Sequence, residues 1–148
     1  MRVVLQRVEQ ACVTLPGGEC RAVGPGLLAL VGVGPGDDPE TVRRLADKTA
    51  NLRIFCNEAG KFDRSLLDTG GEALVISQFT LYADCRRGRR PDFTAARAPA
   101  EAEPLYRAYA EALSRLGVRV KTGEFGASMQ VSLVNDGPVT ICLDSSGI

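Results

Sequence analysis

The chain of 148 residues contains no histidine and no tryptophan. Without histidine, it lacks the usual general base of serine and cysteine hydrolases and the commonest nitrogen ligand of zinc. Any catalysis would therefore use carboxylates, hydroxyls, backbone donors or groups of the substrate itself. The sequence also has no recognisable cluster of metal ligands, so we expect neither a metal ion nor an organic cofactor.

Cysteine is present, but without the spacing of a metal or redox motif. The five cysteines are odd in number, scattered along the chain and form no C-x-x-C pair. We expect reduced thiols, most of them small residues of the core. The residues are Cys12, Cys20, Cys56, Cys85 and Cys142.

Long apolar runs and an excess of charge are also missing. No apolar run approaches the ~20 residues of a membrane span, and the charged start MRVVLQRVEQ is unlike a signal peptide. We therefore expect a cytosolic protein with no membrane partner. Eighteen Lys and Arg against eighteen Asp and Glu exclude a globally basic nucleic-acid coat. The segment RRGRR at 86–90 predicts a small, localised basic patch instead.

The length and an apolar content of 45% suit a single domain over residues 1–148. Two amphipathic helices are expected. Asp38 followed by Pro39 predicts the start of the first. The second lies between Pro99 and Gly117, and its regular part is expected to start near Glu103 because Pro104 has no amide hydrogen.

Alternating apolar residues and turn residues predict about seven strands. This pattern indicates an α+β domain, a mostly antiparallel sheet or open β-barrel-like domain covered by two helices. The expected strands run over 1–8 with 11–15, 19–23, 27–33, 73–81, 118–123, 128–135 and 138–145, and a strand and open turn are expected over 53–62.

Three uncharged polar side chains interrupt the expected strand 73–81. In a strand, Ser77 and Phe79 would share one face, and Gln78 and Thr80 the other. Burying a hydroxyl beside an amide costs about 1–3 kcal/mol for each group left without a partner. A binding surface and a strand that simply leaves the core are both consistent with this pattern.

The second polar stretch is NDGPVT at 135–140, between two apolar segments. One interpretation is a hairpin turn built on Asp136 and Gly137. The other is a functional loop. Gly-Pro pairs also occur at 24–25 and 34–35, in evident loops, so the dipeptide alone does not decide between them.

The combination of these segments changes the interpretation. With MRVVLQRV at the start, NLRIF at 51–55, SQFTLYAD at 77–84 and FGASMQVSLVNDGPVT at 125–140, the chain closely resembles the D-aminoacyl-tRNA deacylase family over residues 1–145. The resemblance implies a homodimer that binds the acceptor end of aminoacyl-tRNA. It also implies hydrolysis of the ester of a D-amino acid, or of glycine mischarged on tRNA-Ala.

The resemblance also assigns roles around the Gly-Pro pair. It implies that Gly137 and Pro138, joined by a cis bond, enter the active site of the other subunit and reject L side chains. A cis X-Pro bond is a minority state, about 5–6% of such bonds in folded proteins. Arg7 matches a position that holds the Gly-Pro pair. From its neighbours alone, it would be a solvent-facing side chain or an ion-pair partner.

The family's favoured mechanism accounts for the missing histidine. The neighbouring ribose 2′-hydroxyl assists the reaction, and backbone N–H groups around Phe79 and Thr80 donate to the oxyanion. Ser77 and Gln78 complete the pocket wall. The rival role for Thr80 is that of a nucleophile, although the motif offers it neither histidine nor nearby lysine as a base.

The remaining candidates would contact the nucleic acid. Phe125 and Met129 match positions near the adenosine and the amino acid, and are otherwise ordinary core residues. The arginines of the basic segment would bind tRNA phosphates without reading sequence, or else form a solvated loop. They are Arg86, Arg87, Arg89 and Arg90.

Two alternative functions are open at this stage. One is a non-catalytic RNA-binding module on the same fold, which would not need a cis Gly-Pro pair beside Thr80. The other is a relative with a trans Gly-Pro pair and relaxed selectivity toward L-alanyl esters.

Overall fold

One long strand, β1 (Arg2–Thr14), organises the main sheet of the computed structural model, which describes residues 1–148. β1 pairs antiparallel with β2, β3 and β8, and the parallel pairs β3–β6 and β6–β7 extend the sheet to six strands. The other strands are β2 (Cys20–Val23), β3 (Gly26–Gly32), β4 (Phe55–Cys56), β5 (Phe62–Arg64), β6 (Glu72–Ser77), β7 (Arg119–Thr122) and β8 (Gln130–Asp144).

The sheet curves until its two ends nearly meet. The side chain of Lys121 on β7 donates to the carbonyl of Ala22 on β2 at 2.6 Å, and Arg21 on β2 donates to the carbonyl of Thr122 on β7 at 3.0 Å. The predicted α+β class and barrel-like sheet are therefore confirmed.

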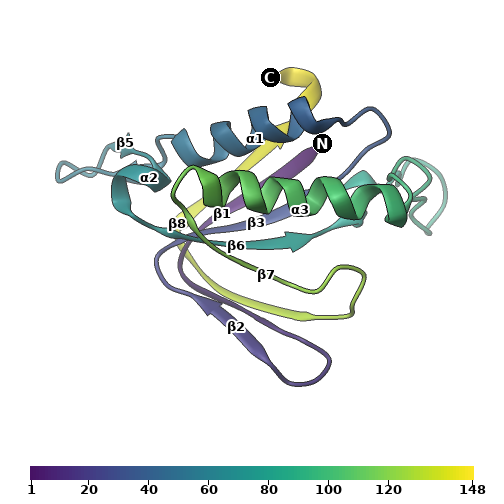
Figure 1. The fold of residues 1–148 in the computed structure, drawn as a ribbon, viewed down its shortest axis with the longest axis horizontal. Coiled ribbons are helices and arrows are strands. Elements are labelled where there is room, and N and C mark those ends of the chain that lie inside the picture. Colours follow the sequence, from purple (N-terminus) through teal and green to yellow (C-terminus); the bar gives the residue numbers. More distant parts are fainter.

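The two long helices lie side by side across one face of this sheet (Figure 1). They are α1 (Pro39–Asn51) and α3 (Pro99–Arg115), and the short α2 (Leu66–Thr69) follows β5. Asp38 caps α1 as predicted, since its carboxylate accepts from the N–H of Thr41 at 2.7 Å. Apolar side chains of both helices and of β1, β3 and β6 form the larger of two buried clusters. None of the helices is long and apolar enough to span a membrane.

The predicted start of the second helix near Glu103 is wrong, because α3 begins at Pro99. Proline suits the first helical position, where no intrahelical donor is needed. Pro104 is exposed, so the carbonyl that it leaves without an amide donor lies on the solvent side of the helix.

The cysteines do not occupy the core as predicted. Cys56, Cys85 and Cys142 are free and exposed. The prediction of reduced thiols is also wrong for Cys12 and Cys20, which are joined by a disulfide between β1 and β2. These positions face outward, so residue type was a poor guide to burial for this set.

The C-terminal segment forms one strand where two were predicted. Both halves of β8 pair with the same long strand, β1, so no hairpin forms at Asp136 and Gly137. The register instead passes from Gln6 opposite Thr140 to Val8 opposite Asn135, which leaves residues 136–139 facing a single residue, Arg7. We call this four-residue segment the Gly-Pro bulge.

Arg7 is buried beneath the Gly-Pro bulge, with 6% of its surface exposed. Its Nε lies 2.9 Å from the Asp136 carboxylate and 3.2 Å from the Asp136 carbonyl. Its Nη1 donates to the carbonyl of Ile54 at 2.6 Å, and its guanidinium lies 5.5 Å from the ring centre of Phe62. The Gly-Pro bulge is thereby tied to the β4–β5 hairpin.

Replacing Arg7 with methionine should lower the free energy of unfolding by about 2–4 kcal/mol, because two carbonyls and a carboxylate lose their donor. Arg43→Met is the control, since Arg43 forms only an exposed ion pair with Glu40 and should cost less than about 1 kcal/mol. Urea denaturation of both variants measures the difference. Equal losses would show that Arg7 contributes no more than a surface arginine.

Candidate active site

The polar motif at 77–80 lies where β6 ends and the chain turns. Strand β6 stops at Ser77, and Phe79–Tyr82 form a 3-10 turn, η1. The predicted strand to residue 81 is therefore wrong from Gln78 onward, and so is the alternation of faces. The N–H of Gln78 still donates to the carbonyl of Val31 on β3 at 2.8 Å, which anchors the turn to the sheet.

Two glycines of the neighbouring strand and loop give η1 room to pack. A Cβ on Gly32 would lie 3.0 Å from the carbonyl oxygen of Gln78, and one on Gly34 would lie 2.5 Å from the Tyr82 hydroxyl. A larger residue at either position would therefore require the turn or the Tyr82 side chain to shift. The sequence signal for these glycines is weak, because they resemble ordinary loop residues after an apolar strand.

Two side chains of the motif, Phe79 and Thr80, are exposed to solvent, whereas Ser77 and Gln78 are half-buried. Phe79 is 57% exposed, and its ring packs edge-on against Phe93 with ring centres 5.1 Å apart. Thr80 is exposed, and its hydroxyl accepts from the side-chain amide of Gln78. The backbone N–H groups of Phe79 and Thr80 come first in the turn, where N–H groups have no intrahelical acceptor.

Arg2, which sequence reasoning missed, holds η1 from the start of β1. Its Nη1 donates to the carbonyl of Leu81 at 2.9 Å, and its Nε lies 3.0 Å from the Asp144 carboxylate. Its guanidinium also lies 4.6 Å from the ring centre of Tyr82. Burial raises the pKa of Tyr82 to about 12, so its hydroxyl stays protonated at neutral pH and is no general base.

The loop between β7 and β8 brings Phe125 and Met129 to the same end of β6. The N–H of Gly123 donates to the carbonyl of Val75, and the Met129 sulfur lies where a Cβ on Gly123 would contact it at 2.7 Å. Both predicted residues are half-buried, not fully in the core.

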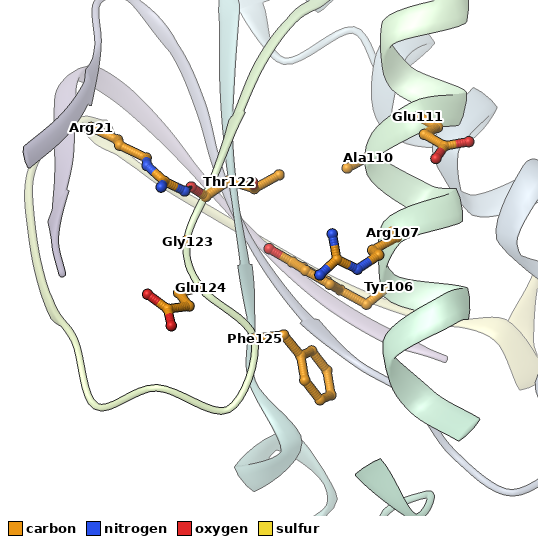
Figure 2. A pocket seen from close by; sticks show the side chains of 9 residues that line it. All are labelled: Arg21, Tyr106, Arg107, Ala110, Glu111, Thr122, Gly123, Glu124 and Phe125. Carbon is orange, nitrogen blue, oxygen red and sulfur yellow. Dashed lines mark hydrogen bonds between the residues drawn. The ribbon is translucent and has the colours of Figure 1, made fainter. Parts of the chain in front are cut away.

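Phe125 also forms part of the wall of a pocket of about 360 Å³ between α3 and this loop (Figure 2). Its ring centre lies 5.8 Å from that of Tyr106. Figure 2 shows Arg107 reaching in from α3, with Glu124 and Arg21 on the opposite side. The pocket walls therefore combine an aromatic pair with charges of both signs.

The basic segment lies on an exposed loop after η1, closed by a bridge between Asp84 and Asp92. Arg86 pairs with Asp84 at 2.5 Å, and its hydrogen bonds hold the pKa of that carboxyl below its usual value. Arg87, Arg89 and Arg90 are exposed and form no ion pair. Three of the four predicted arginines therefore present uncompensated charge.

One copy of the chain does not bring the Gly-Pro pair to the polar motif. The bond between Gly137 and Pro138 is cis, and both residues are exposed. Arg7 is level with Leu27 and Ala73, which places the Gly-Pro bulge three strands away and four residues below Ser77. At normal strand spacing and rise this is about 20 Å.

The picture of the whole fold agrees with that register. The β4–β5 hairpin, which contacts Arg7, and the loop carrying the arginines lie at opposite ends of the molecule (Figure 1). The structure therefore gathers 77–80, Phe125, Met129 and the basic loop at one end. It holds Arg7 with Gly137 and Pro138 elsewhere.

Known proteins of high similarity span the whole chain. A D-aminoacyl-tRNA deacylase of Roseiflexus castenholzii is 61% identical over 99% of this chain and 93% of its own length. One from Thermomicrobium roseum is 62% identical over 99% of this chain and 95% of its own length.

Solved structures share the fold. One described as a c-Myc DNA unwinding element binding protein superposes with a TM-score of 0.90 at 41% identity, covering 97% of this chain and 98% of its own. A probable eukaryotic D-amino acid tRNA deacylase has a TM-score of 0.84 at 17% identity over 96% and 97% of the two chains, which concerns the fold alone. The family model described as D-Tyr-tRNA(Tyr) deacylase matches residues 4–144, and the chain belongs to this family of deacylase enzymes.

Proposed function

We propose that this protein hydrolyses the ester that joins a D-amino acid to the terminal ribose of tRNA, and that it rejects the L ester. The observation that carries this proposal is the Gly-Pro bulge, whose exposed Gly137 and Pro138 are fixed from beneath by the buried Arg7. A surface turn needs no such support, whereas a steric filter must be held still to discriminate. Membership of the deacylase family supports the same activity.

The mechanism that suits this site uses backbone donors. The N–H groups of Phe79 and Thr80 open η1 and would donate to the oxyanion, while Ser77 and Gln78 form the adjoining wall. The ribose 2′-hydroxyl next to the ester would supply acid–base assistance. The Thr80 hydroxyl contacts the Gln78 amide, which is no base, so this contact favours an orienting role over that of a nucleophile.

The proposed site is completed by a second copy of the chain. Within one copy the Gly-Pro bulge lies about 20 Å from the polar motif along the sheet, too far to contact the same ester. The outer edge of β8 is unpaired, and Val131, Leu133 and Val134 on it are exposed. A homodimer that covers this edge would carry the Gly-Pro bulge of each subunit into the site of the other.

Selectivity would follow from close approach of backbone to substrate. Gly137 has a φ of 128°, and a Cβ there would lie 2.7 Å from Val139 and 3.2 Å from Arg7. With no side chain at this position, main-chain carbonyls could meet the substrate's α-ammonium and exclude an L side chain. Glycine has no side chain to exclude, so we include glycyl-tRNA mischarged on tRNA-Ala among the substrates.

The nucleic-acid end of the substrate would lie over the other gathered residues. Phe125 and Met129 would contact the terminal adenosine and the amino acid. Arg87, Arg89 and Arg90 would meet acceptor-end phosphates, with Arg86 partly engaged by Asp84. One observation favours the rival function, a nucleic-acid-binding module without catalysis. A similar structure is described as a c-Myc DNA unwinding element binding protein.

The purified protein, with a chelator present, should hydrolyse D-tyrosyl-tRNA and leave matched L-tyrosyl-tRNA intact. Ester loss is followed with labelled amino acid, and spontaneous hydrolysis without protein is the blank. Binding of both substrates without hydrolysis would overturn the proposal in favour of the binding module. Hydrolysis of both would mean that the Gly-Pro bulge does not discriminate.

Specific activity should fall as the protein is diluted, because a site shared by two copies is lost when they separate. Activity and the dimer fraction from sedimentation velocity are measured over the same concentrations, and the two curves should coincide. Constant specific activity in a sample that is monomeric would place the complete site within one chain.

Replacing Arg87 and Arg89 with alanine should raise the apparent KM for D-aminoacyl-tRNA. It should also flatten the dependence of log KM on log salt, by about 0.7–0.9 for each phosphate that the variant no longer neutralises. The control removes the same charge elsewhere, by replacing Arg43 and Arg115, which form exposed helical ion pairs. Equal slopes for both double variants would assign the loop to solvation alone.

A further inference from the structure

The side-chain oxygen of Gln6 connects the two flanks of the Gly-Pro bulge. Gln6 Oε1 accepts from Asn135 Nδ2 at 2.7 Å and from Thr140 Oγ1 at 2.5 Å. Asn135 is the last residue of β8 before the bulge, and Thr140 is the first after it. A single acceptor therefore sets the separation at which the chain leaves β1 and returns.

Asn135 connects Gln6 to the residues within the bulge. Its Oδ1 accepts from the N–H of Val139 at 3.2 Å, next to Pro138. Because the bulged residues have no ladder partner apart from Arg7, side chains must satisfy part of their backbone. The amide of Asn135 is thus held by Gln6 on one side and holds Val139 on the other.

Gln6 and Arg7 act on the bulge from opposite faces of the sheet. Successive side chains of a strand point to opposite sides, so Gln6 cannot share the buried contacts of Arg7. Arg7 contacts Asp136, at the start of the bulge, whereas the Gln6 network reaches Val139, at its end. Arg7 therefore anchors only the start of the bulge, and the Gln6 network joins its two flanks from the other face.

We propose that Gln6 is a positioning residue for the Gly-Pro bulge, which sets the direction in which Gly137 and Pro138 are presented. Its effect on D/L selectivity rests on the function proposed above, but its effect on the order of the bulge does not. The only atom of Gln6 that the network uses is the acceptor Oε1, so glutamate should replace it and leucine should not.

The test compares Gln6→Leu with Gln6→Glu. Gln10→Leu is the matched control, because Gln10 lies on the same strand, pairs with β8 opposite Val134, is exposed and forms no side-chain hydrogen bond. Thr140→Val removes one of the two donors from the other side with little change of shape, and serves if Gln6→Leu does not fold. Each variant is assayed for kcat and KM with D- and L-tyrosyl-tRNA and for backbone amide exchange over residues 135–140.

In Gln6→Leu, we expect faster amide exchange over 135–140 and a loss of about tenfold in the ratio of D to L hydrolysis, carried by kcat. Thr140→Val should show a smaller effect in the same direction, Gln6→Glu should restore both readouts, and Gln10→Leu should match the wild type. Unchanged exchange and selectivity in folded Gln6→Leu or Thr140→Val would overturn the inference. If the wild type hydrolyses neither ester, the proposed function fails, and the exchange data alone still decide whether Gln6 orders the bulge.

Discussion

A buried guanidinium is the constraint on which the arrangement of this site depends. Taking Arg7 out of water costs several kcal/mol unless its donors are satisfied. Here two carbonyls and one carboxylate satisfy them. Two of these partners belong to Asp136, so the buried charge is stable only while the bulge lies against β1. Without the bulge, the guanidinium would stay buried with fewer acceptors. Without Arg7, the bulge would lose these contacts to β1.

The same strand serves both halves of the proposed site. Arg2 near the start of β1 holds the turn that follows β6, while Gln6 and Arg7 hold the Gly-Pro bulge. A strand rises about 3.3 Å per residue, so the residues between Arg2 and Gln6 keep the contacts to η1 apart from the contacts to the Gly-Pro bulge along β1. Because β1 also forms three of the five pairings of the main sheet, its position is fixed by the core and not by the loops.

How much of this could be predicted from the sequence depended on whether the signal was local. The cap at Asp38 and the apolar face of α1 need only neighbouring residues, and both were predicted correctly.

The turn after Ser77 depends on glycines more than forty residues earlier, at 32 and 34, which no local pattern connects to it. For the same reason the motif resembled a strand with buried polar groups, whereas Phe79 and Thr80 are exposed and Ser77 and Gln78 are only half-buried. The site residues were recoverable mainly because two motifs resemble a known family. Composition and spacing alone left NDGPVT between a hairpin turn and a functional loop, since two apolar segments around Asp-Gly usually pair with each other. Here both segments pair with β1, whose thirteen residues are enough to span both of them. Arg2 and Gln6 escaped notice because a polar residue in an alternating strand is expected to face water.

The distribution of charge also separates the tasks of the proposed enzyme. The 77–80 motif carries no ionisable side chain, and several ionisable groups on or beside η1 are engaged: Tyr82 stays protonated, Arg2 pairs with Asp144, and Asp84 pairs with Arg86. Uncompensated positive charge begins at Arg87, beyond the turn. In the proposed enzyme, binding of the polyanionic substrate would therefore depend on salt, while the reacting ester would meet uncharged side chains and backbone groups. In such a site, selectivity is a matter of shape. Shape in turn depends on how firmly β1 holds a bulge that, in the proposed dimer, acts on the substrate of the other subunit.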